Sequence, residues 1–373
     1  MKIAQIAPLY ESVPPTTYGG TERVIASLTD ALVRAGHDVT LFAAGTSTTL
    51  GTLAPVTDTP LRTRMSRAEM VEVAPHLHLR MLSEVYHRAD EFDVIHSHVD
   101  LWTLPFAEAS RTPTVLTMHG RLDIDTVRET LPQYPGIPLV SISDSQRTAV
   151  ADLALRWVGT VPNGLDLTRY LQAPRAVDDG YLAFVGRISP EKGPIEAVDV
   201  AERSGRALRV AAKIDPLDME YYERMVEPRF ASGCVDFVGE LAEPDKPAFY
   251  ARAAATLFPS DWPEPFGLVM IESMAAGTPV IALRRGSVPE IVADGVTGFI
   301  CDDIDDMRRA VDRVADIDPD DCRRRARQFS SDAMCAGYLR VYEELIASDP
   351  ADAPDRGTTT ATSDLLAGAT SSR

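Results

Sequence analysis

The segment 257–283 constrains the fold of this chain more than any other stretch. Two apolar runs, 255–259 and 279–283, flank a helix-length segment, 266–276, which ends directly before Gly277. Short continuous apolar runs are typical of strands that are buried on both faces of a parallel sheet. A glycine just after a helical segment is typical of a helix C-terminus. The segment therefore predicts one strand–helix–strand crossover inside a parallel sheet.

The helical part of this segment has no polar face and carries one carboxylate, Glu272. A helix that is apolar all round is buried, and a buried carboxylate must find partners or lose its charge. A second carboxylate, Glu264, lies in the loop before the helix, where the backbone N–H groups of Phe266, Gly267 and Leu268 can hold an anion. This pattern predicts a nucleotide sugar, whose phosphates meet the helix N-terminus and whose hydroxyls meet the carboxylates. An ordinary buried helix, with Glu272 paired to a neighbouring arginine, fits the pattern equally well.

The composition of the 373-residue chain is that of a globular protein with room for about two domains. A formal net charge of −18 argues against nucleic acid or an anionic membrane surface as the main partner. No signal peptide is visible after Lys2, and no apolar run is long enough for a transmembrane segment. The four cysteines show no C-x-x-C spacing, which favours free thiols in a reducing compartment. We therefore expect a cytoplasmic protein.

Strand-like and helix-like segments alternate along both halves of the chain. In the first half, strands are predicted at 2–7, 37–45, 92–98, 112–120 and 137–143. In the second half, they are predicted at 181–188, 207–214, 234–241, 255–260, 279–283 and 297–301. Helices are predicted at 66–89, near 101–109, and at about 303–317, 319–329 and 331–347, whereas 46–65 is predicted to be a loop. This alternation is typical of doubly wound α/β sheets.

Turn-forming residues without periodicity at 161–180 predict a linker between the two halves. We therefore expect an N-terminal domain at 1–165 and a C-terminal domain at 166–330, with a cleft between them. The segment 331–348 is expected to form a terminal helix. The last residues, 349–373, have almost no apolar content and are expected to be a disordered tail.

A Gly-Gly pair stands directly before the first predicted helix. Thr21 is expected to cap this helix, which ends at Gly36, so that Gly20 lies at its N-terminus. The pair resembles a phosphate-binding loop, but the G-x-G-x-x-G fingerprint of dinucleotide-binding enzymes is not met. A Rossmann-type dehydrogenase is therefore disfavoured.

The segment GRISPEKG places Arg187 and Lys192 where a predicted strand gives way to a helix. Open parallel sheets bind ligands at the carboxyl ends of their strands. An arginine for bidentate contact and a lysine as a compact charge suit a diphosphate. A solvated charged loop is the alternative, and it is less attractive because the chain has only two other internal lysines, Lys213 and Lys246, besides Lys2.

Three histidines stand at predicted strand ends. His119 is followed by a glycine, which allows a ligand to approach the backbone, although a structural histidine would have the same spacing. His96 and His98 have no carboxylate cluster beside them, so we expect them to pack or to line a cleft rather than to bind metal. The Asp-Ile-Asp triplets at 123–125 and 303–305 follow no suitable strand. We therefore predict no metal site.

Together, these segments resemble a retaining glycosyltransferase of family 4 with the GT-B fold. The matching motifs, in the family's order, are YGGTERV, DVIHSH, TMHG, VPNGLD, GRISPEKG, EPFGLVMIESMAAGTPVIA and GSVPEIVADGVTGF. The Glu-x7-Glu pair with its Pro-Phe-Gly is the most specific of them. The resemblance implies two Rossmann-like, doubly wound parallel-sheet domains with an interdomain cleft, and a terminal helix that crosses back to the first domain. The N-terminal segment and MHGRLD are similar to a bacterial subgroup whose acceptors are mostly unassigned.

The resemblance also implies a role for each candidate residue. Glu264 would contact the hydroxyls of the donor sugar, Glu272 would hold the ribose, and His119 would lie near the anomeric carbon. The groups on the donor diphosphate would be Gly20, Arg187, Lys192 and the backbone amides of 267–268. Gly286 and Ser287 stand where many members carry Gly-Gly, which leaves the donor contacts at that point open.

The activity that the resemblance implies is transfer of a hexose, with retention, from UDP-glucose or a similar UDP- or GDP-sugar. The acceptor would be a hydroxyl of a small molecule, a glycan or a glycolipid, and the reaction would need no metal and no cofactor. Loops at 46–65 and 120–136 would choose the acceptor. Two alternatives are a GT-B epimerase or hydrolase that uses the same donor, and a non-catalytic protein that only binds the nucleotide sugar.

Overall fold

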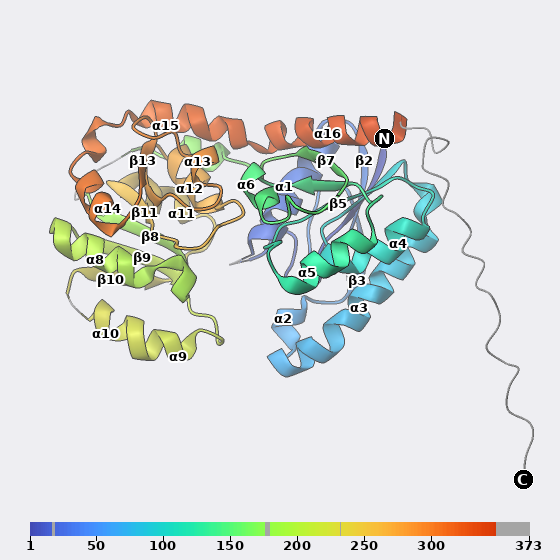
Figure 1. The fold of residues 1–373 in the computed structure, drawn as a ribbon, viewed down its shortest axis with the longest axis horizontal. Coiled ribbons are helices and arrows are strands. Elements are labelled where there is room, and N and C mark those ends of the chain that lie inside the picture. The colour runs from blue at the N-terminus through green and yellow to red at the C-terminus, as the bar shows by residue number, and fades with distance from the viewer. Residues whose placement is uncertain (17–18, 176–179, 232, 348–373) are drawn as a thin grey trace, which may run out of the picture.

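The computed structural model describes residues 1–16, 19–175, 180–231 and 233–347. Two parallel β-sheets form its framework, and Figure 1 shows the sheet of the N-terminal half beside that of the C-terminal half. Among the described residues, the first sheet has seven strands in the order β3-β2-β1-β4-β5-β6-β7, and the second has six in the order β10-β9-β8-β11-β12-β13. Every strand pair is parallel. The predicted doubly wound α/β fold class is confirmed.

The central strand of the first sheet shows why its apolar runs could be recognised. Ile3 pairs with Val39 on one side and Val94 on the other, and all three are buried. The strands of this sheet are β1 (Lys2–Ile6), β2 (Asp38–Ala44), β3 (Thr52–Thr57), β4 (Val94–Ser97), β5 (Thr114–Thr117), β6 (Leu139–Ser141) and β7 (Trp157–Thr160). Its helices are α1 (Gly20–Arg34), α2 (Leu61–Arg64), α3 (Arg67–His87), α4 (Leu104–Ala109), α5 (Asp125–Thr130) and α6 (Asp144–Thr148).

The second sheet contains the crossover predicted from the segment 257–283. Its strands are β8 (Leu182–Arg187), β9 (Leu208–Lys213), β10 (Val235–Gly239), β11 (Ala255–Phe258), β12 (Val280–Leu283) and β13 (Gly298–Cys301). The helices of this half are α7 (Thr168–Leu171), α8 (Pro194–Ser204), α9 (Met219–Tyr221), α10 (Glu227–Phe230), α11 (Lys246–Arg252), α12 (Leu268–Ala275), α13 (Val288–Ile291), α14 (Ile304–Val311) and α15 (Pro319–Ala326). β11 and β12 are buried throughout and pair in parallel, with α12 between them in the chain. The strand–helix–strand prediction is confirmed.

The last described helix, α16 (Ser331–Ala347), runs from the second half back along the first, where it packs against α1 (Figure 1). Its buried side chains include Tyr338, Tyr342 and Leu345. The domain limits at residues 165 and 330 stay predictions, and the predicted tail at 349–373 lies outside the described residues. None of the described helices is long and apolar enough to cross a bilayer.

Two local predictions were wrong. The segment 46–65 is not a continuous loop, because it contains the edge strand β3 and the short helix α2. β3 is half exposed and includes Pro55, so it shows no apolar run that could have revealed it. Thr21 does not cap α1, because the N-cap residue is Gly19 and Thr21 lies in the first turn.

Candidate active site

A cleft of about 530 Å³ lies between the two sheets. Residues from both sheets line it, many at the carboxyl ends of strands, where open parallel sheets bind their ligands. The residues predicted for catalysis and for donor binding all line this cleft: Gly20, His119, Arg187, Lys192, Glu264, Phe266, Gly267, Leu268 and Glu272. The fold therefore brings together groups that are far apart in the chain.

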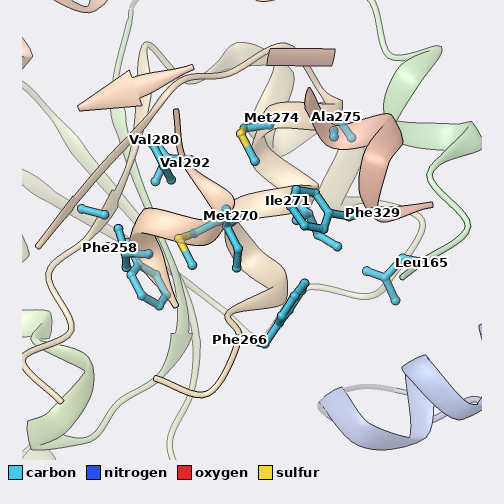
Figure 2. Packing of buried hydrophobic residues seen from close by; sticks show 14 of the residues in the cluster. Leu165, Phe258, Phe266, Met270, Ile271, Met274, Ala275, Val280, Val292 and Phe329 are labelled. Carbon is cyan, nitrogen blue, oxygen red and sulfur yellow. The ribbon is translucent and has the colours of Figure 1, made fainter. Parts of the chain in front are cut away.

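The N-terminus of α12 opens on this cleft. Its N-cap, Gly267, has a φ of 95°, a backbone conformation that strongly favours glycine. No side chain among the described residues caps the helix, which leaves its first amides able to bind an anion. Figure 2 shows Met270, Ile271 and Met274 leaving α12 on different sides into apolar packing. The helix is thus buried all round, as predicted.

Glu272 projects from α12 and is 1% exposed. Its Oε1 forms an ion pair with Arg23 of α1 and accepts a hydrogen bond from the Tyr170 hydroxyl at 3.3 Å, while Oε2 accepts one from the Tyr250 hydroxyl at 2.8 Å. Nζ of Lys246 lies 3.9 Å from Oε1. Burial alone would raise the pKa of Glu272, but Arg23 and Lys246 hold it below its ordinary value, so the carboxylate stays ionised. Glu272 is therefore paired with an arginine, as the alternative interpretation of the sequence allowed. This arginine, Arg23, belongs to the N-terminal half of the chain.

Glu264 lies in the loop between β11 and α12. Its Oε2 forms an ion pair with Lys192 and accepts a hydrogen bond from Nε1 of Trp262 at 2.7 Å. Gly286 packs against the backbone of this loop. Its φ is 52°, and a Cβ there would lie 2.4 Å from the backbone N and O of Glu264. The backbone N of Ser287 also donates to the carbonyl of Glu264 at 3.0 Å. The Gly286-Ser287 pair therefore sets the position of the Glu264 loop.

Arg187 stands at the end of β8 and contacts two carboxylates. Its Nη2 lies 2.5 Å from Oε1 of Glu191, and its Nε lies 3.3 Å from Oδ2 of Asp218. Both basic residues predicted for a diphosphate, Arg187 and Lys192, thus already hold anionic oxygens at the edge of the cleft. Carboxylates and phosphates present similar pairs of oxygens to a guanidinium group. Arg187 and Lys192 can therefore hold anionic oxygens at this corner of the site.

His119 ends a hydrogen-bonded chain of buried polar groups. Its Nε2 lies 2.8 Å from Nδ1 of His98, whose Nε2 lies 2.9 Å from Oε1 of Gln5. Because an amide oxygen can only accept, this network assigns the proton of His98 to Nε2 and makes Nε2 of His119 a donor. Nδ1 of His119 is then the ring nitrogen that can accept a hydrogen bond. Burial lowers the pKa of His119 to about 4, so the ring is neutral at pH 7.

The same chain continues to α16. Gln5 donates from Nε2 to the Tyr342 hydroxyl at 3.1 Å, and Nδ1 of His96 lies 2.7 Å from that hydroxyl. Nε2 of His96 lies 2.7 Å from Oγ1 of Thr117, which is 2.9 Å from the hydroxyl of Tyr338. His96 therefore packs inside a buried network, as expected, and two tyrosines of α16 complete this network.

Comparison with known proteins supplies the family. The sequence model described as "Glycosyl transferases group 1" matches residues 171–331, and the model "Glycosyltransferase Family 4" matches residues 18–169. The chain belongs to glycosyltransferase family 4. The matches together span both halves of this glycosyltransferase, including both walls of the cleft.

Among the relatives of this glycosyltransferase is a glycogen synthase of Mycobacterium tuberculosis, 28% identical over 364 residues that cover 84% of this chain and 86% of the relative. A D-inositol 3-phosphate glycosyltransferase of Corynebacterium efficiens is 28% identical over 309 residues, covering 69% and 73%. A solved Anabaena structure in complex with UDP and glucose is similar with a TM-score of 0.70 and 20% identity, covering 92% and 100%. The GT-B fold is confirmed.

Several cleft residues of this glycosyltransferase were not predicted. Arg23 contacts Glu272 and also lies 2.7 Å from Oε1 of Glu243, and no local pattern could have indicated either contact. Lys213 and Lys246 also line the cleft. The only feature of the sequence that could have drawn attention to them is that the chain has so few lysines. A further residue, Asn163, also lines the cleft; it lies in the segment 161–180, which the sequence predicted only as a linker.

The Asp-Ile-Asp triplets have structural roles outside the cleft. Asp123 forms an ion pair with Arg121 at 2.6 Å, and Asp303 caps α14 by accepting from the backbone N of Asp306 at 2.8 Å. Within the part of the chain that the structure describes, no group of three or more histidine, cysteine or acidic side chains could hold a metal ion. Metal independence of the reaction stays a prediction.

Proposed function

We propose that this glycosyltransferase transfers a hexose, with retention, from UDP-glucose or a similar UDP- or GDP-sugar to an acceptor hydroxyl, without a metal ion. The observation that carries the proposal is the convergence on one cleft of the α12 N-terminus, the cations Arg187 and Lys192, and the carboxylates Glu264 and Glu272. The diphosphate of a nucleotide sugar would bind the α12 N-terminus, Arg187 and Lys192. The sugar hydroxyls would donate to the two carboxylates. The UDP and glucose named in the Anabaena structure support this donor class.

The diphosphate would lie between α12 and the end of β8. Lys192 and Arg187 now pair with Glu264, Glu191 and Asp218, so binding would exchange carboxylate oxygens for phosphate oxygens. The amides at the start of α12 would add neutral donors and the positive end of the helix dipole. These groups would stabilise the charge that develops on the leaving diphosphate, which is a metal ion's role in other transferases.

The two glutamates would contact different parts of the donor. Glu264 stands on a loop beside Lys192, so it would accept from hydroxyls of the transferred hexose next to the diphosphate. Glu272 lies about a turn inside α12, where Tyr250 and Arg23 hold its carboxylate in place. It would use its remaining lone pairs to accept from the ribose hydroxyls.

His119 would act as a neutral hydrogen-bond acceptor for the transferred sugar. Its Nε2 is engaged by His98, so Nδ1 is the atom available to a sugar hydroxyl. In the proposed reaction, the bond between the anomeric carbon and the phosphate oxygen breaks, and a bond to the acceptor oxygen forms on the same face. The leaving phosphate oxygen takes the acceptor's proton, so no side chain has to serve as a general base.

The proposal is tested by incubating the full chain with UDP-glucose, GDP-mannose and other nucleotide sugars, together with a pool of hydroxyl acceptors. Released nucleotide and glycosylated product are quantified with and without EDTA, and NMR of the product gives the anomeric configuration. We expect a product that retains the donor configuration and turnover that survives EDTA. Nucleotide release without product would favour a hydrolase, donor isomerisation an epimerase, and binding without turnover a non-catalytic protein. A product with inverted anomeric configuration would refute the proposed retention. Activity that EDTA abolishes and Mg²⁺ restores would refute the proposed metal independence.

A further inference from the structure

Glu264 uses one of its two carboxylate oxygens for contacts within the protein. Its Oε2 accepts from Nζ of Lys192 and from Nε1 of Trp262, the latter at 2.7 Å. Its Oε1 accepts no hydrogen bond from any residue that the structure describes. A carboxylate that is held through one oxygen can present the other to a ligand in a defined direction. Trp262, which is half-buried and also lines the cleft, is therefore one of two groups that set the position of Oε1.

The backbone of the loop brings Trp262 and Glu264 together. The backbone N of Glu264 donates to the carbonyl of Trp262 at 2.8 Å, which closes a tight turn around Pro263. Each of the two residues precedes a proline, Pro263 or Pro265, and a residue in that position is restricted to extended conformations. The backbone on both sides of the turn thus has few alternatives, and the indole N–H and the carboxylate meet across it.

The indole ring of Trp262 has contacts of its own, from both halves of the chain. Nζ of Lys192 lies 5.1 Å from the ring centroid, and the guanidinium carbon of Arg121 lies 5.5 Å from it. The electron-rich face of an aromatic ring attracts cations at such distances. Arg121 belongs to the N-terminal half, in the segment between β5 and α5. The orientation of the ring, and with it the direction of its N–H, is therefore supported by groups other than the carboxylate.

Donor binding would change which contacts hold Glu264. Lys192 is proposed above to exchange the Glu264 oxygen for a phosphate oxygen of the donor. The N–H of Trp262 lies on the same loop as Glu264 and is already bound to its carboxylate, so this hydrogen bond would stay in place. In the donor complex, Trp262 would then be the contact that keeps the carboxylate in position.

We propose that Trp262 is a positioning residue, which holds Oε2 of Glu264 so that Oε1 accepts from a hydroxyl of the transferred hexose. The inference rests on the proposed function, since it assumes that Glu264 contacts this hexose. Trp262 would act on the reaction only through the carboxylate. A contact to the reacting sugar that loses its alignment lowers kcat, whereas the nucleotide, which does not reach this contact, keeps its affinity.

The first test compares wild type with Trp262→Phe, which keeps an aromatic ring beside Lys192 and removes the N–H. Calorimetry gives the Kd of UDP and GDP, and nucleotide release from UDP-glucose and GDP-mannose, with the acceptor pool present, gives kcat. We expect kcat to fall by roughly tenfold, because the lost hydrogen bond is to a charged group, while the Kd of the nucleotide changes by less than about threefold. Unchanged kcat would overturn the inference, and so would an equal loss of nucleotide affinity. A wild type that binds neither nucleotide, or turns over neither sugar, would instead contradict the proposed function.

A second test determines whether Trp262 acts through Glu264. In a Glu264→Ala background, adding Trp262→Phe should change kcat by less than about twofold, because the carboxylate that the indole holds is absent. A further loss of roughly tenfold in this background would show that the two residues act independently, and would overturn the inference. The control is Trp157→Phe, on β7 and outside the cleft, which should keep the wild-type kcat. Circular dichroism ensures that folded variants are compared.

Discussion

Glu272 and Glu264 should respond very differently to the same substitution, glutamine. Glu272 is 1% exposed, and its ion-pair partner Arg23 is 13% exposed. Removing one partner of a buried ion pair costs about 3–5 kcal/mol, because the other charge stays buried without compensation. Arg23 would still pair with Glu243. We therefore expect Glu272→Gln to lower the free energy of unfolding by about 3 kcal/mol, the lower end of this range. For a chain of 373 residues, whose unfolding entropy is about 2.1 cal/mol/K per residue, that corresponds to a fall in Tm of roughly 4 °C.

Glu264→Gln should cost much less stability. The Glu264 side chain is 15% exposed, and its partners Lys192 and Trp262 stand at the edge of the cleft. Pairs of this kind contribute on the order of 1 kcal/mol or less. Because Glu264 competes with a phosphate for Lys192, UDP affinity should stay the same or rise in the variant. Turnover of the UDP-sugar should fall, because the hexose loses a contact that strengthens during the reaction.

Thermal unfolding, calorimetry with UDP and turnover of the UDP-sugar together separate the two roles. Glu272→Gln should lower Tm and weaken UDP and UDP-sugar by similar factors, since both ligands carry the ribose. Glu264→Gln should leave Tm and UDP affinity nearly unchanged and lower kcat. Circular dichroism at the assay temperature ensures that folded protein is compared. Equal loss of UDP affinity in both variants, or equal loss of Tm, would refute the assignment of Glu264 to the hexose and Glu272 to the ribose.

Three further predictions concern binding, the terminal helix and pH. Lys192→Ala should weaken UDP binding about ten- to a hundredfold, because a charged hydrogen bond contributes roughly 1.5–3 kcal/mol; Lys2→Ala is the control, and unchanged affinity in Lys192→Ala would place the diphosphate elsewhere. A chain that ends at Gln328 should unfold at a clearly lower temperature than one that ends at Ala347, because it lacks the buried tyrosines of α16; equal midpoints in thermal unfolding would contradict this role of the helix. Burial lowers the pKa of His78 to about 4, so the unfolded state binds more protons between pH 6.5 and 4, and stability falls as the pH falls through this window. Between pH 7 and 4.5, wild type should therefore lose about 2.5 kcal/mol more unfolding free energy than His78→Gln, measured by urea denaturation, and identical losses would show that His78 is not buried as a neutral ring.

The fold was predictable where a segment is buried on all sides. β11, β12 and α12 show this, since their apolar runs follow directly from the lack of solvent contact. The edge strand β3 was not predictable, because only two of its six residues are fully buried and its sequence resembles a loop. The hydrophobic pattern of a segment depends on its burial, so strands at the edge of a sheet are the hardest to recognise in the sequence.

The site was predictable in its residue types but not in its connections. Motif residues such as Lys192 and Glu264 could be named, yet their pairing with each other depends on how β8 and β11 lie side by side. Arg23 is the clearest case: it contacts Glu272 only because α1 and α12 face each other across the two halves. Contacts between distant segments follow from topology and have no signature in local sequence.

The return of α16 to the first sheet has a consequence for how the chain is made on the ribosome. The buried polar chain of Gln5, His96 and Thr117 needs the hydroxyls of Tyr338 and Tyr342 as partners. At synthesis rates of about 5–20 residues per second, these tyrosines are added roughly 10–40 s after the last strand of the first sheet. During that interval the surface of the N-terminal half that α16 later covers stays exposed. The first half of this glycosyltransferase therefore cannot complete its buried polar network until α16 has been synthesised.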